Sequence, residues 1–152
     1  MPELFTKPER AAWRGFIATQ SRLFRLIEDD LRARFGLSHT EFEVLLRLYL
    51  SEQGRVRVQD LAARSLLSTS GTSRAIDRLA RAGHVERQGA EEDGRGAYAA
   101  LTEAGRGHFE RAAEAHVALV RREFLSRFTP EELAQLGGFW ERARPDAQPR
   151  TA

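Results

Sequence analysis

Small hydroxyl side chains and arginines are concentrated between residues 68 and 81, in the stretch STSGTSRAIDRLAR. Hydroxyl groups near the N-terminus of a helix can donate to phosphate oxygens without bulk, and the helix dipole favours a negative charge there. An arginine can read the edge of guanine through two parallel hydrogen bonds. The pattern therefore indicates contact with double-stranded DNA, and the expected contacts in this stretch are Ser68, Ser70, Thr72, Ser73, Arg74 and Arg78.

Within the helix predicted for this stretch, Arg74 is the best candidate for reading a base in the major groove. Arg78 and Arg81 lie further along, where phosphate is the expected ligand. The alternative is a solvated helix face on which Asp77 pairs with an arginine four residues away, and we favour it for Arg81. One face is expected to pack inward, formed by Thr72, Ile76, Leu79 and Gly83.

A charged loop, residues 89–96, separates two predicted strands, His84–Gln88 and Ala97–Leu101. Arg95 is its only cation, and Asp93 could pair with it and fix the loop shape. Arg95 would then be able to reach a narrow minor groove. A solvated charged hairpin is the alternative, which we weigh evenly for Asp93, whereas for Arg95 we favour DNA contact.

Helices and one further strand must position these groups. The sequence S/T-x-x-E, which predicts a helix start, occurs at Thr6, Ser38 and Thr129. Together with apolar residues three or four apart, it predicts helices over 6–35 and 38–52 and a short one from Thr129. Further helices are predicted over 58–65, from Ser68 to about Ala82, and from a cap at Thr102 to about residue 128, with a short strand at Arg55–Arg57.

The order of helix, turn, arginine-bearing helix and β-loop is that of a winged helix-turn-helix. We therefore predict a mainly α (α+β) single domain over residues 1–152. Its winged helix-turn-helix, with a two-stranded β-wing, occupies residues 38–102. Helical regions flank it at 6–36 and 103–144, and much of the first helix should meet another helix, because its long aromatic stripe exceeds what one small winged domain can bury. Arg55 joins the expected DNA contacts.

The composition fits a soluble globular protein, with 41% hydrophobic and 30% charged residues. The net charge is only +2, but 23 of the 24 basic residues are arginine. The absence of cysteine excludes disulfides and thiolate zinc sites. No apolar run approaches the roughly 18 residues of a membrane span, so we expect a cytoplasmic protein without membrane contact.

Three segments carry a resemblance to a known family: LSHTEFEVLLRL, VQDLAARSLLSTSGTSRAIDRLARAGHVER and EDGRGAYAALTEAGR. Together they resemble the MarR family of bacterial transcription regulators, whose wing signature Asp-x-Arg stands here as Asp93-Gly94-Arg95. The resemblance implies a homodimer joined by its terminal helices and reading a palindrome. It also implies regulation by a small aromatic or carboxylate ligand. Acidic residues at the wing tip, Glu91 and Glu92, depart from the family pattern.

An effector pocket is the weakest of these expectations. Trp13, Phe16 and Phe42 could line it, and Arg25 could receive a carboxylate. The alternative places the aromatic residues in a dimer core and the arginine in solvent. The four histidines are scattered. His39 and Glu43 lie four apart, so a metal pair there is conceivable, but we favour structural or surface histidines over a zinc site. We find no organised nucleophile, cofactor motif or metal cluster, and therefore expect no enzyme, cofactor or metal.

Two functional hypotheses follow. The first is a sequence-specific transcription regulator, a ligand-responsive repressor that acts as a homodimer on a pseudo-palindromic operator. The second, motivated by the acidic wing tip and small net charge, is a helical dimer that serves as a protein- or ligand-binding module without DNA binding. The operator, the effector and the choice between repression and activation stay open at this point.

Overall fold

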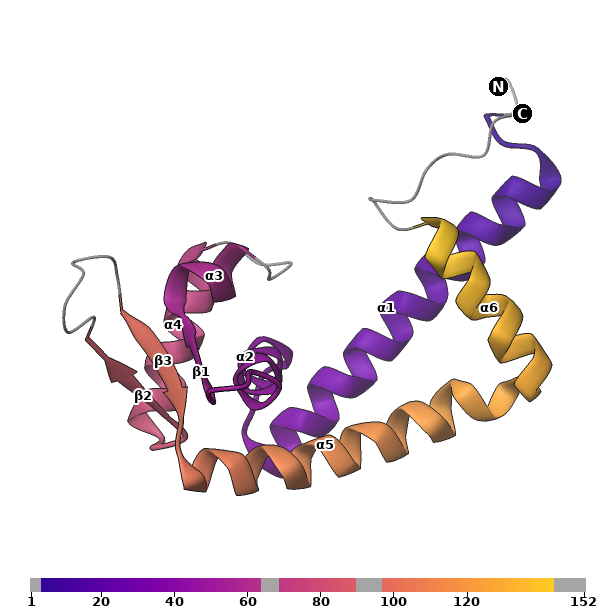
Figure 1. Cartoon of the computed structure of the whole chain (residues 1–152). Coiled ribbons are helices and arrows are strands. Elements are labelled where there is room, and N and C mark those ends of the chain that lie inside the picture. Colours follow the sequence, from indigo (N-terminus) through magenta and orange to yellow (C-terminus); the bar gives the residue numbers. More distant parts are fainter. Residues whose placement is uncertain (1–3, 64–68, 90–96, 144–152) are drawn as a thin grey trace. The chain divides into compact units, whose positions relative to one another are not determined.

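The computed structural model describes residues 4–63, 69–89 and 97–143, which contain six α-helices and three β-strands (Figure 1). The chain divides into two compact units, residues 1–116 and 117–152, with the boundary inside helix α5 (Glu103–Glu123). None of the described helices is long and apolar enough to cross a membrane. The mainly helical winged fold predicted from the sequence is confirmed, and its division into functional regions stays a prediction.

Helix α1 (Lys7–Phe35) begins and ends where the sequence predicts. The Thr6 hydroxyl accepts a hydrogen bond from the backbone N–H of Glu9, and the Glu9 carboxylate accepts one from the backbone of Thr6 at 2.7 Å. At the other end Gly36 adopts a φ of 68°, a left-handed conformation that costs glycine little. Local capping chemistry therefore fixes both ends of this helix.

Helix α2 (His39–Tyr49) has the predicted capping box at Ser38 and Glu41, but it is shorter than the predicted 38–52. Its last turn tightens, because the backbone N–H of Ser51 bonds to the carbonyl of Leu48, three residues back. Helices α3 (Val58–Ala63) and α4 (Thr69–Arg81) follow. The predicted turn at 66–68 and the cap at Ser68 lie outside the described residues.

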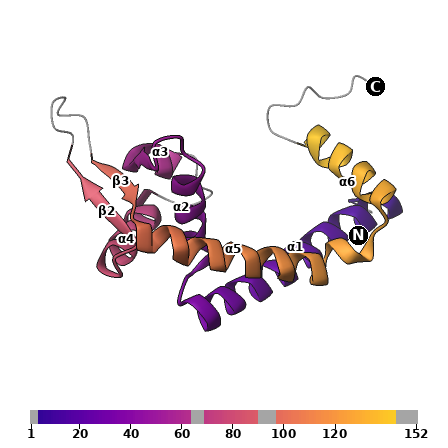
Figure 2. The same ribbon diagram turned by 60° about the horizontal axis from the view of Figure 1, so that its bottom comes forward.

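The strands β1 (Arg55–Arg57), β2 (Val85–Gln88) and β3 (Tyr98–Leu101) form one antiparallel sheet in the order β1-β3-β2. The predicted wing strands β2 and β3 pair with Val85 opposite Leu101 and Gln88 opposite Tyr98. Strand β1 adds a third strand on the free edge of β3, with Arg55 opposite Ala100. Figure 2 shows α4 beside the β2–β3 pair.

One hydrophobic core joins α2, α3, α4 and the sheet, and α1 and α5 contribute to it from their adjoining ends. Leu45, Leu48 and Ile76 are completely buried, and Leu61 is buried among them. The core also sets how α5 begins. A Cβ atom on Gly105 would come within 1.9 Å of the His84 carbonyl oxygen, so only glycine permits the observed contact between α5 and the start of the wing.

Helix α5 begins at the predicted cap, where the Thr102 hydroxyl accepts a hydrogen bond of 2.9 Å from the backbone of Gly105. The predicted continuation to residue 128 is interrupted after Glu123, and a 3₁₀ turn, η1 (Leu125–Arg127), follows. Helix α6 (Pro130–Ala143) then starts at the predicted capping box, in which the backbone N–H of Thr129 donates to Glu132 at 2.9 Å.

Candidate nucleic-acid interface

Helix α4 has one buried and one exposed face, as its sequence predicts. Ala75, Ile76 and Leu79 are at most 2% exposed and pack in the core. Arg74, Asp77 and Arg78 lie on the exposed side. The helix therefore presents charged side chains to solvent from a rigid support, an arrangement suited to a groove of DNA.

Arg74 is the most available cation on this helix. Its side chain is exposed and has no hydrogen bond or ion pair to any described residue. A guanidinium in this situation keeps all five N–H groups for an external acceptor. The geometry is compatible with the predicted base contact, which stays a prediction.

Thr72 requires a correction. Its side chain is 0% exposed, and its hydroxyl has no hydrogen-bond partner among the described residues. The sequence pattern placed Thr72 both on the inward face and among the DNA contacts, and these two roles are incompatible on a helix that is packed against a core. The inward position is confirmed, and the predicted DNA contact of Thr72 is wrong.

Ser73 belongs to a small network that the sequence did not predict. The Nη2 atom of Arg87, on β2, donates to the Asp77 carboxylate at 2.6 Å and to the Ser73 hydroxyl at 3.4 Å. Asp77 thus pairs with the wing strand, and not with an arginine four residues along its own helix. Arg81 donates instead to the backbone carbonyl of Asp77 at 3.3 Å. A charge count alone did not reveal this link between the helix and the wing.

Arg78 also has an internal partner. Its Nε atom donates to the carboxylate of Glu41 on α2 at 2.5 Å, and the Glu41 side chain is only 8% exposed. Burial raises the pKa of Glu41, but hydrogen bonds from Ser38 and from Arg78 outweigh it and hold the pKa below its usual value. The Arg78 side chain remains 49% exposed. Arg78 therefore has a structural role as the partner of Glu41, and its contact with DNA stays a prediction.

Arg55 lies exposed on the edge strand β1, and its guanidinium sits 5.3 Å from the ring centre of Tyr98. Arg57 lies 5.1 Å from the same ring. Cation–π contacts of this kind help to orient arginine side chains, and Nε of Arg55 also donates to the side chain of Gln53 at 3.2 Å. Two positive charges therefore meet on one edge of the sheet, although only Arg55 was predicted as a DNA contact.

Several predicted contacts have no side chain to assess. Ser70 lies within the bounds of α4, near its N-terminus, but its side chain is outside the described residues. Ser68, Asp93 and Arg95 lie outside them altogether. Their expected contacts with DNA stay predictions.

The four predicted effector residues lie on two helices, Trp13, Phe16 and Arg25 on α1 and Phe42 on α2. Phe42 is 5% exposed and packs in the core, with its ring centre 5.4 Å from that of Phe109, and its role in an effector pocket stays a prediction. Trp13 and Arg25 are twelve residues apart on α1, about 18 Å along the helix at 1.5 Å per residue. Phe16 lies beside Trp13, with 5.9 Å between the ring centres.

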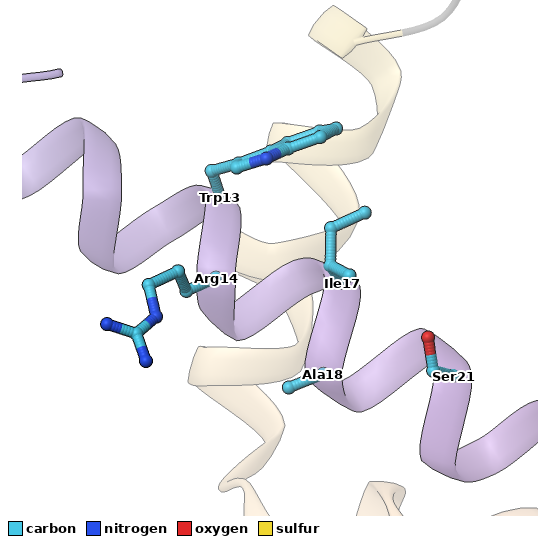
Figure 3. Close-up of a pocket in the computed structure, with 5 residues that line it drawn as sticks. All are labelled: Trp13, Arg14, Ile17, Ala18 and Ser21. Carbon is cyan, nitrogen blue, oxygen red and sulfur yellow. The ribbon is translucent and has the colours of Figure 1, made fainter. Parts of the chain in front are cut away.

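A shallow hollow does occur at Trp13, with a volume of about 260 Å³ (Figure 3). All five of its lining residues come from successive turns of α1: Trp13, Arg14, Ile17, Ala18 and Ser21. A single helix surface cannot enclose a ligand, so this hollow is a site where a flat apolar surface is exposed and not a closed binding pocket.

The histidines gather in pairs and do not form a metal centre in the described residues. The rings of His84 and His108 stack with centres 4.2 Å apart and planes at 10°. Burial lowers the pKa of His84, and the nearby His108 and Arg111 lower it further. Burial likewise lowers the pKa of His116, whose ring lies 4.9 Å from that of Phe42. These environments favour neutral rings.

Comparison with known proteins supports the winged fold over nearly the whole chain. The structure of AbsC, a MarR family transcriptional regulator from Streptomyces coelicolor, is similar with 36% identity and a TM-score of 0.84, covering 93% of this chain and 95% of that one. Another MarR family transcriptional regulator from Streptomyces coelicolor, solved in complex with DNA, is 31% identical with a TM-score of 0.87, covering 99% and 95%.

Sequence comparison agrees. YkoM, an uncharacterised HTH-type transcriptional regulator from Bacillus subtilis (strain 168), is 34% identical over 101 residues. That alignment covers 66% of this chain and 64% of YkoM, just under two thirds of its length. The MarR family profile matches residues 35–96, which include helices α2 to α4 and strand β2. The chain belongs to the MarR family of winged helix-turn-helix transcriptional regulators.

Proposed function

We propose that this protein is a homodimer that binds double-stranded DNA in a sequence-specific manner and represses transcription from a pseudo-palindromic operator. The observation that carries the proposal is the exposed guanidinium of Arg74, which has no hydrogen bond or ion pair to any described residue, on a helix whose opposite face is buried in the core. A relative with 31% identity was solved in complex with DNA, which supports the same partner here. Such a regulator acts on the chromosome, in the bacterial cytoplasm.

Two copies are needed because one recognition helix reads only a few base pairs. In a dimer, two α4 helices would enter successive major grooves about one helical turn apart, roughly 10 base pairs. The two copies would associate through apolar side chains that α1 exposes, among them Trp13 and Ile17. Arg55 and Arg78, and Arg95 in the wing loop, would supply further contacts.

Release by a small aromatic or carboxylate ligand completes the proposal and rests on family membership. Ligand binding would change the spacing of the two winged modules and so weaken the fit to the operator. The prediction is that one such compound lowers operator affinity in a titration. Full operator affinity at saturation with every tested compound would remove this part of the proposal and leave DNA binding intact.

The decisive experiment is selection of bound duplexes from a random pool, followed by binding measurements with the selected duplex. We expect an inverted repeat. The variant Arg74→Ala should lose about 1–3 kcal/mol and relax the preference at one position of each half-site. Arg81→Ala, on the same helix, serves as the control. It also removes an arginine side chain, but Nε of Arg81 already donates to the backbone carbonyl of Asp77.

Failure to enrich any sequence would contradict the proposal. If, in addition, the wild-type protein showed no salt-dependent binding to any duplex, the alternative of a helical protein- or ligand-binding dimer would replace the proposal. A DNA-binding dimer that neutralises several phosphates must lose affinity steeply as salt rises.

A further inference from the structure

Arg87 on strand β2 reaches across to the exposed face of α4, where it contacts Asp77 and Ser73, one helical turn apart. We propose that Arg87 binds a DNA phosphate and that Asp77 is the residue that positions it. This inference rests on the proposed DNA-binding function and adds to it a contact from the wing strand together with the group that holds that contact in place.

The sheet register directs Arg87 toward α4. Arg87 lies opposite Ala99, and Val85, two residues earlier on the same strand face, lies opposite Leu101. Val85 and Ala99 are buried in the core beneath α4. Because side chains alternate along a strand, Arg87 leaves the sheet on this same side, and its long stem carries the guanidinium to the exposed face of α4.

The contacts with Asp77 and Ser73 occupy only some of the N–H donors of the Arg87 guanidinium. A guanidinium has five N–H groups, and among the described residues only Nη2 of Arg87 has hydrogen-bond partners. The Arg87 side chain is 37% exposed and that of Asp77 is 51% exposed. Donors therefore remain available on the solvent side, next to Ser73, which is itself a predicted DNA contact.

Asp77 would oppose DNA binding at this surface if it had no basic partner. A free carboxylate on the same face as Arg74 would repel phosphates, and the 2.6 Å ion pair with Arg87 neutralises it. The pair also restricts the rotamers of Arg87 before DNA arrives, so less side-chain entropy is lost on binding. In this way Asp77 turns a flexible cation into a pre-positioned one.

Phosphate is the ligand we assign, and not a base edge. Base edges are read by residues near the N-terminus of a recognition helix. Arg87 comes from the neighbouring strand and sits beside Asp77, at the ninth residue of α4. Contacts from flanking elements to the sugar-phosphate backbone fix the register of the protein on the duplex.

The test compares Arg87→Gln, Asp77→Asn, the double variant and Glu86→Gln in full-length protein, with the selected duplex and with an unrelated duplex over a range of salt. Glu86→Gln is the matched control. It removes the same charge from the same region, but Glu86 lies on the other side of β2, where its carboxylate accepts a hydrogen bond from Gln88 at 2.7 Å. Thermal melting verifies that each variant is folded.

Arg87→Gln should weaken binding to both duplexes by a similar factor and reduce the slope of log affinity against log salt by about 0.9 per protomer. Asp77→Asn should keep the slope, because Arg87 is still charged. It should nevertheless bind the selected duplex roughly 2- to 12-fold more weakly than Glu86→Gln, through the lost ordering of one side chain. In the Arg87→Gln background, Asp77→Asn should no longer weaken binding.

Two results would overturn the inference. An unchanged salt slope in Arg87→Gln would show that Arg87 does not touch phosphate. Binding by Asp77→Asn that equals or exceeds that of Glu86→Gln would show that Asp77 only repels DNA and positions nothing. Both results leave wild-type binding intact, whereas failure of the wild type to select any duplex refutes the proposed function itself, and this inference with it.

Discussion

Apolar side chains form a buried core in the winged module, residues 38–102, but are exposed on the N-terminal half of α1. In the module, Leu45, Leu48 and Ile76 are completely buried within one chain. On α1, Trp13 is 53% exposed and Phe16 is 41% exposed, although both belong to an equally regular helical stripe. The same sequence pattern therefore produces a closed core in one region and an open apolar surface in the other.

The difference lies in what each region packs against. Helix α2 has α4 and the sheet as neighbours within the chain, whereas α1 contributes to the core only near its C-terminal end, through Ile27, Leu31 and Phe35. Exposed aromatic residues at helical spacing favour association with another helix. The core around α2 and α4 is therefore closed within one chain, whereas the first half of α1 exposes an apolar surface, which we propose is covered by a second copy.

The largest effect should come from a cavity in the closed region. Leu48→Ala removes a completely buried side chain and should lower the free energy of unfolding by about 2–5 kcal/mol. Leu50→Ala, two residues later and 71% exposed, is the control and should change it by no more than about 0.5 kcal/mol. Denaturant unfolding measures both. Equal effects would mean that the core of the module is not closed as described.

A charge in the exposed apolar stripe of α1 should weaken dimerisation but not folding. Ile17→Glu places a charge in the exposed stripe and should weaken dimerisation at least about tenfold, because an apolar side chain loses its burial. Thr19→Glu adds the same charge about 200° around the helix and is the control. Sedimentation over a range of concentrations measures the dissociation constant. A monomeric wild type, or equal effects of the two variants, would refute the proposed dimer surface.

Local chemistry explains which parts of the fold could be predicted. The three capping boxes at Thr6, Ser38 and Thr129 need only residues three positions apart, and all three occur in the structure. The premature end of α5 had no such signal, because its apolar spacing continues past Glu123. Periodicity therefore located the helices, but it could not show where a regular helix gives way to a 3₁₀ turn.

The candidate site was harder to predict because its key contacts join distant residues. Arg78 and Glu41 are 37 positions apart, and Arg87 and Asp77 come from a strand and a helix. Spacing rules within one helix suggested a partner for Asp77 four residues away, and tertiary packing supplied a different one. Arg74 could be predicted as exposed because helical periodicity alone decides which face of α4 is buried.

A third prediction concerns the internal tie between α4 and α2. Arg78→Ala leaves the buried Glu41 carboxylate without its cation and should lower the free energy of unfolding by about 1–2 kcal/mol at neutral pH, a modest loss because half of Arg78 is exposed to screening solvent. Since the folded-state pKa of Glu41 lies below its ordinary value of 4.5, the contribution is present above pH 4.5 and is lost as the pH falls through the lowered pKa.

Denaturant unfolding of wild type and Arg78→Ala at several pH values tests this tie. The two stabilities should differ at neutral pH and converge in acid. A difference that stays constant down to acid pH would mean that Arg78 stabilises the module by packing alone, and that Glu41 does not depend on it.

The smallest effect should appear where the start of the wing meets α5 and the C-terminal end of α1. His84 ends the connection from α4 to the wing, and its ring stacks on His108 of α5, whose Nε2 atom lies 3.1 Å from the carbonyl oxygen of Phe35 at the end of α1. Burial, His108 and Arg111 all lower the pKa of His84 below its ordinary value of 6.5. As pH falls below 6.5, the unfolded chain therefore binds a proton before the folded chain does, and stability declines toward the lowered pKa.

Replacing His84 should make stability less dependent on pH in this window. Unfolding midpoints of wild type and His84→Asn at about pH 7.5 and about pH 5.5 bracket the ordinary titration of histidine. The wild type should lose more stability on acidification than the variant does. A residual decline in the variant is expected from His116, whose pKa is lowered in the same direction. Identical declines in both proteins would show that folding does not lower the pKa of His84.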